Sequence, residues 1–132
     1  MQKNDIYEIE ITGMTDEGDG VGRINGFAVF VPYTIIGETV RIILIKVLKN
    51  YAVGKLIEVI IPSKSRTKSA CADFYKCGGC KLWHMSYEEE LLFKKKKVSD
   101  CLKRIGGFDN INIDDVVPSS KISRYRNKSQ FP

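Results

Sequence analysis

The sequence predicts a mainly β fold, in which a small barrel of five strands is followed by a cysteine-rich loop and one long helix. Apolar and polar residues alternate with a period of two over residues 6–61, and glycines and asparagines separate the alternating runs. A helical period of three to four begins only after Ser86. The 132 residues are 43% hydrophobic and 28% charged, a globular composition that excludes a wholly disordered chain.

The first strand is expected over residues 6–12, where apolar Tyr7, Ile9 and Ile11 alternate with two glutamates. A tight hairpin follows, with strands over residues 21–25 and 27–31. Its turn is the dipeptide Asn25-Gly26, which is among the strongest short-range hairpin signals.

Two longer strands are expected over residues 39–47 and 51–61, with a turn near Lys49 and Asn50. These five strands contain too few residues for two packed sheets. Closing them into an OB-like antiparallel barrel hides both sheet edges. The predicted organisation is a barrel over residues 1–62, a linker and cysteine loop over 63–85, and a helix with the start of an α/β central domain over 86–132.

The helix is expected to begin at Ser86, which has capping-box spacing to Glu89, and to end at Gly106 and Gly107. One stripe of this helix consists of Tyr87, Leu91, Lys94, Val98, Leu102 and Ile105. Two further strands are expected over residues 111–117 and 122–131.

The net charge of +5 is unevenly distributed along the chain. Residues 1–61 hold six basic against eight acidic residues, whereas residues 62–132 hold fifteen against eight. A basic second half suits a polyanion such as RNA. No apolar stretch approaches the roughly 18 residues that would cross a bilayer, so we expect a soluble, cytoplasmic, monomeric protein with no membrane partner.

Three cysteines, Cys71, Cys77 and Cys80, form a C-x5-C-x2-C pattern with two glycines inside the last spacing. This spacing favours a shared metal or cluster, and three interpretations stay open. An iron-sulfur cluster needs a fourth thiolate, a structural zinc site would use His84 as its fourth ligand, and the simplest alternative is a loop of reduced or disulfide-bonded thiols. Cys101 lies within the expected helix and is interpreted as a small buried hydrophobic residue.

Several segments together resemble a known family. The loop Glu17-Gly18-Asp19-Gly20-Val21-Gly22-Arg23, the stop Phe30-Val31-Pro32 and the entry Gly37-Glu38-Thr39-Val40 resemble a TRAM domain. The cysteine pattern followed by His84 resembles the cluster motif of the RNA uracil-5-methyltransferases, and Tyr125-Arg126-Asn127-Lys128 resembles the start of their central domain.

That resemblance implies an RNA-binding amino-terminal part of an enzyme that uses S-adenosylmethionine. It implies that Cys71, Cys77 and Cys80 bind a 4Fe-4S cluster together with a fourth cysteine outside this chain. The catalytic domain would lie beyond Pro132, so no catalytic residue and no S-adenosylmethionine ligand is assigned here. The implied partner is ribosomal or transfer RNA.

Basic and aromatic side chains supply the candidate RNA contacts, because OB-like barrels bind single strands with a basic groove and stacking aromatics. Isolated lysines are more often simply solvated, Phe27 is expected in the core, and the run 94–97 is interpreted as a solvated helix face. The candidates are Arg23, Lys49, Tyr51 and Lys55 on the barrel, Lys64, Arg66 and Lys68 in the linker, and Arg124, Arg126 and Lys128, with Lys121 nearby, in the last segment.

The leading hypothesis is therefore the RNA-recognition part of a methyltransferase. A stand-alone zinc-containing RNA-binding protein is the alternative, distinguished by stoichiometric zinc. A ferredoxin-like electron carrier is disfavoured, because one incomplete site beside an RNA-type barrel gives electrons no evident partner.

Overall fold

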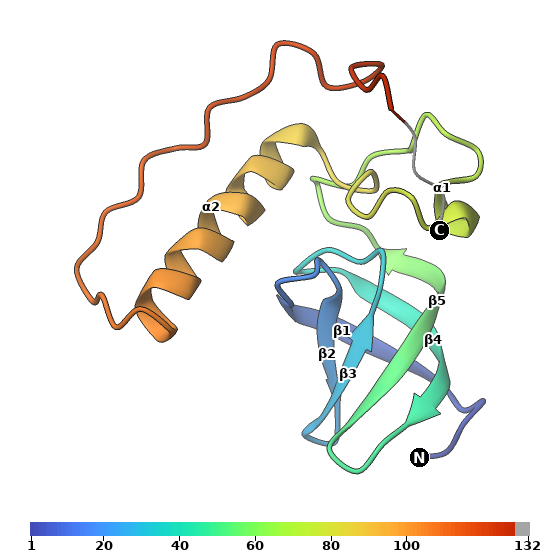
Figure 1. Ribbon diagram of the computed structural model, residues 1–132. Coiled ribbons are helices and arrows are strands. Elements are labelled where there is room, and N and C mark those ends of the chain that lie inside the picture. Colours follow the sequence, from blue (N-terminus) through green and yellow to red (C-terminus); the bar gives the residue numbers. More distant parts are fainter. Residues whose placement is uncertain (129–132) are drawn as a thin grey trace. The chain divides into compact units, whose positions relative to one another are not determined.

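The computed structural model describes residues 1–128 and divides the chain into two compact units, Met1–His84 and Met85–Pro132. Each unit is described by itself (Figure 1). The first unit holds every strand of the described residues and a one-turn helix, and the second holds one long helix. The elements are β1 (Ile6–Met14), β2 (Gly20–Ile24), β3 (Phe27–Val31), β4 (Thr39–Val47), β5 (Tyr51–Ile61), α1 (Phe74–Cys77) and α2 (Tyr87–Arg104).

The five strands close into a barrel in the order β1-β2-β3-β5-β4, which confirms the predicted fold class. The prediction that all neighbours are antiparallel is wrong at one seam, because β3 and β5 pair in parallel from Ala28 and Tyr51 onward. A closed ring with an odd number of strands cannot alternate direction all the way round. The parallel seam is therefore a geometric consequence of closure.

The hairpin of β2 and β3 forms as predicted, with Ile24 opposite Phe27. Both turn residues have positive φ, 50° at Asn25 and 83° at Gly26. Asparagine and glycine tolerate this backbone region, which the type I′ turn of a two-residue hairpin requires. The Arg23 guanidinium closes the turn by donating to the Gly26 carbonyl oxygen at 3.0 Å.

The barrel interior is filled by aliphatic side chains from all five strands. The alternation predicted for β1 is confirmed, since Ile9 and Ile11 are buried between exposed glutamates. Phe27 packs against this core, as expected. The buried cluster consists of Ile9, Ile11, Ile24, Val29, Val31, Val40, Ile42, Leu44 and Ala52.

Two glycines of β2 allow the barrel to close tightly. A Cβ at Gly20 would collide with the hydroxyl of Thr34, and one at Gly22 would lie 2.7 Å from Ile9 Cδ1 and 2.8 Å from the Glu10 carbonyl oxygen. Gly13 of β1 differs, because a Cβ there would meet Val21 Cβ at an ordinary 3.7 Å. The glycines of β2 are therefore required by packing, and neither has a positive φ.

A buried carboxylate joins the barrel to the linker that follows it. Glu38 is fully buried, and its two oxygens accept from Arg66 Nε at 2.6 Å and Arg66 Nη2 at 2.9 Å. The same oxygens accept the backbone N–H of Ile35 at 2.9 Å and of Ser63 at 3.2 Å. Charge-assisted, bidentate bonds of this kind fix geometry strongly.

Burial raises the pKa of Glu38, but the hydrogen bonds from Arg66, Ile35 and Ser63 and the positive charge of Arg66 outweigh it. The pKa of Glu38 therefore lies below its usual value of 4.5. Burial likewise lowers the pKa of Arg66, and bonding to Glu38 more than compensates, so the pKa of Arg66 is raised. The pair is fully ionised at neutral pH.

The second unit is organised by α2, which begins as predicted. The Ser86 hydroxyl accepts a hydrogen bond from the Glu89 backbone N–H at 3.2 Å. Three glutamates occupy the first turn, where their negative charges interact favourably with the positive end of the helix dipole. Beyond the last turn, Gly107 has a φ of 72°, and Phe108 N–H donates to the Leu102 carbonyl at 3.0 Å. Within the described residues, no helix is both long and apolar enough to span a membrane.

The strand predicted over residues 111–117 is not observed, and neither is one over 122–128. The remainder of the second predicted strand, residues 129–131, lies outside the described residues. An alternating pattern forms a strand only where a neighbour completes its hydrogen bonds, and the described part of this unit provides no such neighbour. Instead, Tyr87 accepts the Ser119 backbone N–H at 2.9 Å, and Lys95 pairs with Asp115 at 2.7 Å.

We expect Gly22→Ala to lower the free energy of unfolding by about 1 to 3 kcal/mol, because the added methyl group overpacks the barrel against Ile9 and the backbone of Glu10. Urea unfolding followed by circular dichroism measures this change. Gly13→Ala is the matched control and should cost much less. Equal losses at the two positions would contradict the packing argument.

We expect Glu38→Gln to lower the free energy of unfolding by about 3 kcal/mol at pH 7, because it leaves the largely buried Arg66 charge without its counterion. A carboxyl group whose pKa is lower in the folded state than its usual value of 4.5 stabilises the fold above pH 4.5. This stabilisation is lost as the pH falls through the folded-state pKa. The difference in free energy of unfolding between wild type and Glu38→Gln should therefore become smaller at acidic pH. The control Glu58→Gln removes an exposed partner of Arg41 and should have a much smaller effect. If this difference in free energy did not depend on pH, the proposed stabilisation by the Glu38–Arg66 ion pair would be contradicted.

Candidate nucleic-acid interface

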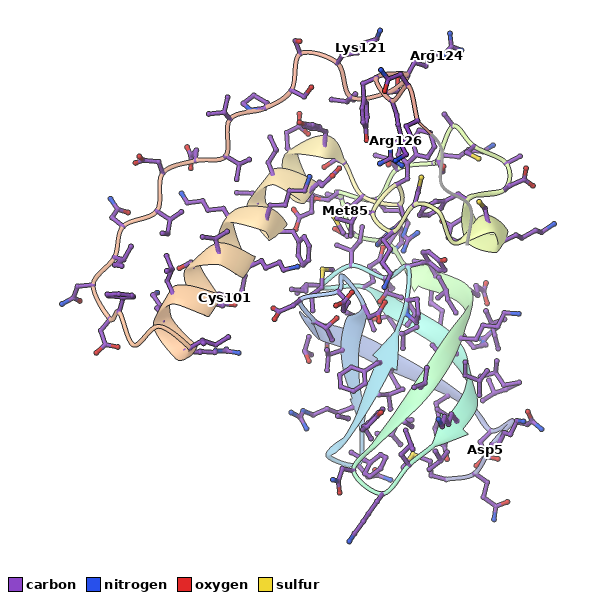
Figure 2. The ribbon with its side chains drawn as sticks, in the orientation of Figure 1. Asp5, Met85, Cys101, Lys121, Arg124 and Arg126 are labelled. Carbon is purple, nitrogen blue, oxygen red and sulfur yellow. The ribbon has the colours of Figure 1, made fainter. Side chains whose placement is uncertain are left out.

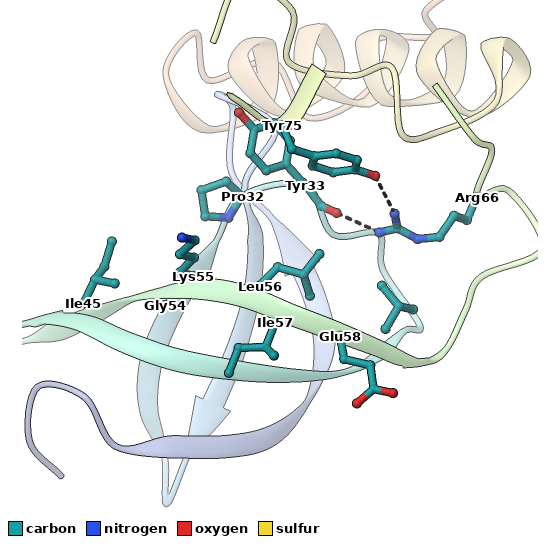
Figure 3. Close-up of a pocket in the computed structure, with 11 residues that line it drawn as sticks. Pro32, Tyr33, Ile45, Gly54, Lys55, Leu56, Ile57, Glu58, Arg66 and Tyr75 are labelled. Atoms are coloured by element: carbon teal, nitrogen blue, oxygen red, sulfur yellow. Dashed lines mark hydrogen bonds between the residues drawn. The ribbon is translucent and has the colours of Figure 1, made fainter. Parts of the chain in front are cut away.

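A groove of about 370 Å³ lies over β5 in the first unit (Figure 3). Its walls combine aliphatic side chains with two tyrosines and the two cations Lys55 and Arg66. Figure 3 shows the Arg66 side chain reaching in from the linker, with hydrogen bonds to Tyr33 and Tyr75. The lining residues are Pro32, Tyr33, Ile45, Gly54, Lys55, Leu56, Ile57, Glu58, Val59, Arg66 and Tyr75.

An aromatic cluster borders this groove. The ring of Tyr33 lies edge-on to Phe74 and to Tyr75, with centroids 5.2 Å apart in each case, and Phe74 and Tyr75 are 4.8 Å apart. Phe74 is buried and anchors the one-turn helix α1, whereas Tyr75 is 51% exposed. The cysteine loop is thus attached to the barrel by ring packing of a kind that favours edge-to-face geometry.

The structure separates the candidate RNA contacts of the barrel. Lys55 lies in the groove, whereas Lys49 and Tyr51 lie at the turn from β4 to β5 and Arg23 lies at the β2–β3 turn. Tyr51 packs against Phe30 with ring centroids 5.2 Å apart and stays 39% exposed. Only Lys55 of this set shares the groove with a linker candidate.

The three linker candidates differ in their surroundings. Lys64 and Lys68 are exposed, so their ammonium groups face solvent. Arg66 is engaged with Glu38, and its Nη2 also donates to the Tyr33 carbonyl oxygen at 2.7 Å. Its first role is therefore structural, although it also lines the groove.

The candidates of the last segment are exposed within the second unit. Figure 2 shows Lys121, Arg124 and Arg126 along the chain that follows α2. The Arg126 guanidinium carbon lies 6.0 Å from the Tyr125 ring centroid, and Lys128 is also exposed. The lysines of residues 94–97 lie on a solvated helix face, as expected, since Lys94 pairs with Glu90 and Lys96 pairs with Asp100.

The cysteine loop presents its thiols in reduced form. Cys71 is half-buried, Cys77 and Cys80 are exposed, and Gly78, with a φ of 74°, caps the carboxyl end of α1. A Cβ at Gly79 would lie 3.4 Å from Cys77 Sγ, in van der Waals contact with that sulfur. The donors suit a thiolate site in type, but within the described residues no group of three or more His, Cys, Asp or Glu side chains is gathered to hold a metal.

His84 lies apart from solvent, packed against Phe74 and Tyr33. Its Nε2 is 3.2 Å from the Thr34 carbonyl oxygen, while Nδ1 is buried with no hydrogen-bond partner among the described residues. Burial lowers the pKa of His84, so the ring is neutral at pH 7 and its Nε2–H donates to Thr34. The ring serves the packing of the loop, and no cluster of donors accompanies it as the zinc alternative would require.

Sequence reasoning assigned no role to three residues of this region, namely Glu38, Tyr33 and Tyr75, although Glu38 lies in a segment that resembles a TRAM domain. Glu38 follows a glycine in a turn, which suggests a solvated residue. Tyr75 lies inside the cysteine loop, where the sulfur pattern dominates. The only local signal at Tyr33 is the preceding Pro32, and it does not reveal the positive φ of 65° that Tyr33 adopts.

Comparison with known proteins identifies the barrel. Residues 2–57 match the family described as the TRAM domain. An uncharacterised RNA methyltransferase of Clostridium tetani is 49% identical over 132 residues, which is 100% of this chain and 28% of that protein. One from Staphylococcus aureus is 42% identical over 130 residues, which is 98% of this chain and 29% of that protein. The chain thus spans less than a third of the length of these relatives.

One solved structure resembles most of the chain. The crystal structure of the Pyrococcus abyssi tRNA (uracil-54, C5)-methyltransferase in complex with S-adenosyl-L-homocysteine superposes with a TM-score of 0.57 and 32% identity. The match covers 87% of this chain and 24% of that one. The five-stranded barrel described above therefore matches the TRAM domain family over residues 2–57, in a chain whose whole length is similar to part of proteins named RNA methyltransferases.

Proposed function

We propose that this chain is the RNA-binding amino-terminal portion of an S-adenosylmethionine-dependent RNA (uracil-5-)-methyltransferase of the cytoplasm. It holds ribosomal or transfer RNA for methylation by a catalytic domain elsewhere in the protein. The observation that carries this proposal is the similarity of the whole chain, at 49% identity, to a part of a protein named an RNA methyltransferase. The solved neighbour, named a tRNA uracil-54 C5-methyltransferase, supports uracil as the target base.

The distribution of charge supports RNA as the partner. Residues 1–61 carry a net −2, so the barrel supplies shape more than charge. Residues 62–132 carry a net +7, and the exposed cations Lys64, Lys68, Arg124, Arg126 and Lys128 lie there. Phosphate contacts dominate nucleic-acid affinity, so these flanking segments are proposed to supply most of the binding free energy.

We also propose that Cys71, Cys77 and Cys80 hold a 4Fe-4S cluster in the complete protein, with a fourth thiolate from outside this chain. The support is the spacing of the three residues, their thiols free of disulfide bonds, the exposure of Cys77 and Cys80, and the absence of a side chain at Gly79, where a Cβ would lie 3.4 Å from Cys77 Sγ. When bound, such a cluster cross-links distant parts of a chain. This chain's own contribution is the anchoring of the loop through Phe74 and Arg66.

We expect the chain to bind a uridine-containing transfer RNA transcript at low salt, with an affinity that falls steeply as salt rises. Changing Arg124, Arg126 and Lys128 together to alanine should reduce the slope of log K against log salt by up to about 3, because each lost phosphate contact contributes about 0.9. Fluorescence anisotropy over a series of salt concentrations measures this slope.

The matched control changes Lys94, Lys95 and Lys96 to alanine, which removes the same charge from lysines that already have carboxylate partners. Its slope should change much less. An equal change in both triple variants would indicate only a general effect of net charge. Methyl transfer from S-adenosylmethionine by this chain alone would contradict the proposed division of roles.

We expect the complete protein, purified without oxygen, to contain iron and acid-labile sulfide that are lost in Cys77→Ser and in Cys80→Ser, because each substitution removes a proposed thiolate ligand. Metal and sulfide analysis with visible absorption measures this loss. Cys101→Ser is the matched control and should retain both elements. Stoichiometric zinc without sulfide would instead support a zinc site.

A further inference from the structure

We infer that the groove over β5 receives one unpaired nucleobase of single-stranded RNA, stacked on Tyr75, with the adjoining phosphate near the ammonium group of Lys55. This inference rests on the proposed RNA-binding function and adds to it a base-binding pocket with named contacts.

The size and walls of the groove suit a flat aromatic ligand. Its volume of about 370 Å³ falls in the range of roughly 300 to 1,000 Å³ that is typical of small-molecule sites. Leu56, Ile57 and Pro32 give it apolar walls, and polar groups stand at its margin. A nucleobase needs this combination, because its faces are apolar and its edges are polar.

Tyr75 has the properties of a stacking platform. It keeps 51% of its surface exposed, although Tyr33 and Phe74 hold its ring from two sides at centroid distances of 5.2 and 4.8 Å. Phe74 is buried, so this support is fixed in the core of the loop. An exposed ring held in place loses little conformational entropy when a base stacks on it.

The charges at the groove favour a nucleic acid over an apolar peptide. Within the described residues, no carboxylate lies within ion-pair distance of the Lys55 ammonium group, so this cation is available for a phosphate. The one acidic residue of the lining, Glu58, is paired with Arg41 at 2.7 Å. Arg66 lies at the opposite margin, where its Nη1 is 3.5 Å from the Tyr75 hydroxyl, but its charge is neutralised by Glu38, so Lys55 is the unpaired cation of the lining among the described residues.

The backbone beside the groove is held in an uncommon conformation. Tyr33 has a φ of 65°, which a bulky side chain rarely adopts, and its carbonyl oxygen accepts from Arg66 Nη2 at 2.7 Å. Strain of this kind persists only where the surroundings impose it, and it is concentrated at ligand clamps and active sites. Here it places the Tyr33 ring against Tyr75.

The test measures the anisotropy of two fluorescein-labelled probes with the 132-residue chain. One probe is a short oligouridylate, and the other is a ribose-phosphate oligomer of the same length without bases. We expect the wild type to prefer the base-containing probe by about 5- to 150-fold, as one stacked base predicts. Tyr75→Ala should lose this preference, and Tyr75→Phe should restore it. Lys55→Ala should weaken binding of both probes more than the control Lys46→Ala, an exposed lysine of β4 outside the groove.

Circular dichroism of each variant reports whether the fold is retained, and the preference of the wild type tests the inference even if Tyr75→Ala does not fold. Binding of both probes with equal affinity by the wild type would overturn the base pocket and leave the proposed function intact. The base pocket would also be overturned, and the proposed function left intact, if Tyr75→Ala kept the preference for the base-containing probe while Tyr51→Ala lost it. That result would place the stacking site at the β4–β5 turn. Absence of binding to either probe, and to transfer RNA, would overturn both proposals.

Discussion

The buried carboxylate of Glu38 is the contact on which the first unit depends. Its oxygens accept from the barrel turn at Ile35 and from the linker at Ser63 and Arg66, so one side chain joins segments about thirty residues apart. Arg66, held in this way, fixes the carbonyl of Tyr33 and borders Tyr75. This ion pair therefore positions one margin of the groove, and ring packing of Phe74 and Tyr75 on Tyr33 attaches the cysteine loop. Such a pair specifies geometry more than it adds stability, because desolvation offsets much of its attraction.

Under the proposed function, the chain divides RNA recognition between shape and charge. The barrel carries a net −2 and contributes a closed, rigid sheet with a groove on β5, whereas the flanking segments carry +7 in residues 62–132. Cations in irregular segments can contact successive phosphates of an RNA backbone. A pocket on a strand can bind a single base by its shape and by stacking. This division fits the proposed role, in which the protein holds a folded RNA and also binds an unpaired uridine.

The strands could be predicted from sequence because their signals are local. Asn25-Gly26 determines a hairpin, and the alternation of Ile9 and Ile11 assigns one face to the core. The parallel pairing of β3 with β5 could not be predicted in this way, because it depends on closure of the ring. A strand over residues 111–117 was expected from the same alternation and is absent, because alternation does not supply a pairing partner.

The roles of Glu38 and Tyr75 were missed, because they depend on Arg66 and Phe74, which only the tertiary structure brings next to them. One-turn helix α1 was likewise hidden by the cysteine spacing.

The most direct test of this account is a nuclear magnetic resonance titration of the isotope-labelled chain with oligouridylate. If the barrel and its linker form the RNA surface, the amide resonances of Tyr33, Lys55, Leu56 and Tyr75 should shift together and saturate at one ligand concentration. Resonances of Asn25 and Gly26 at the β2–β3 turn should remain in place. Shifts confined to that turn, or shifts elsewhere in the chain while these four groove residues stay in place, would contradict the central claim that the groove anchored by Glu38 and Arg66 binds RNA.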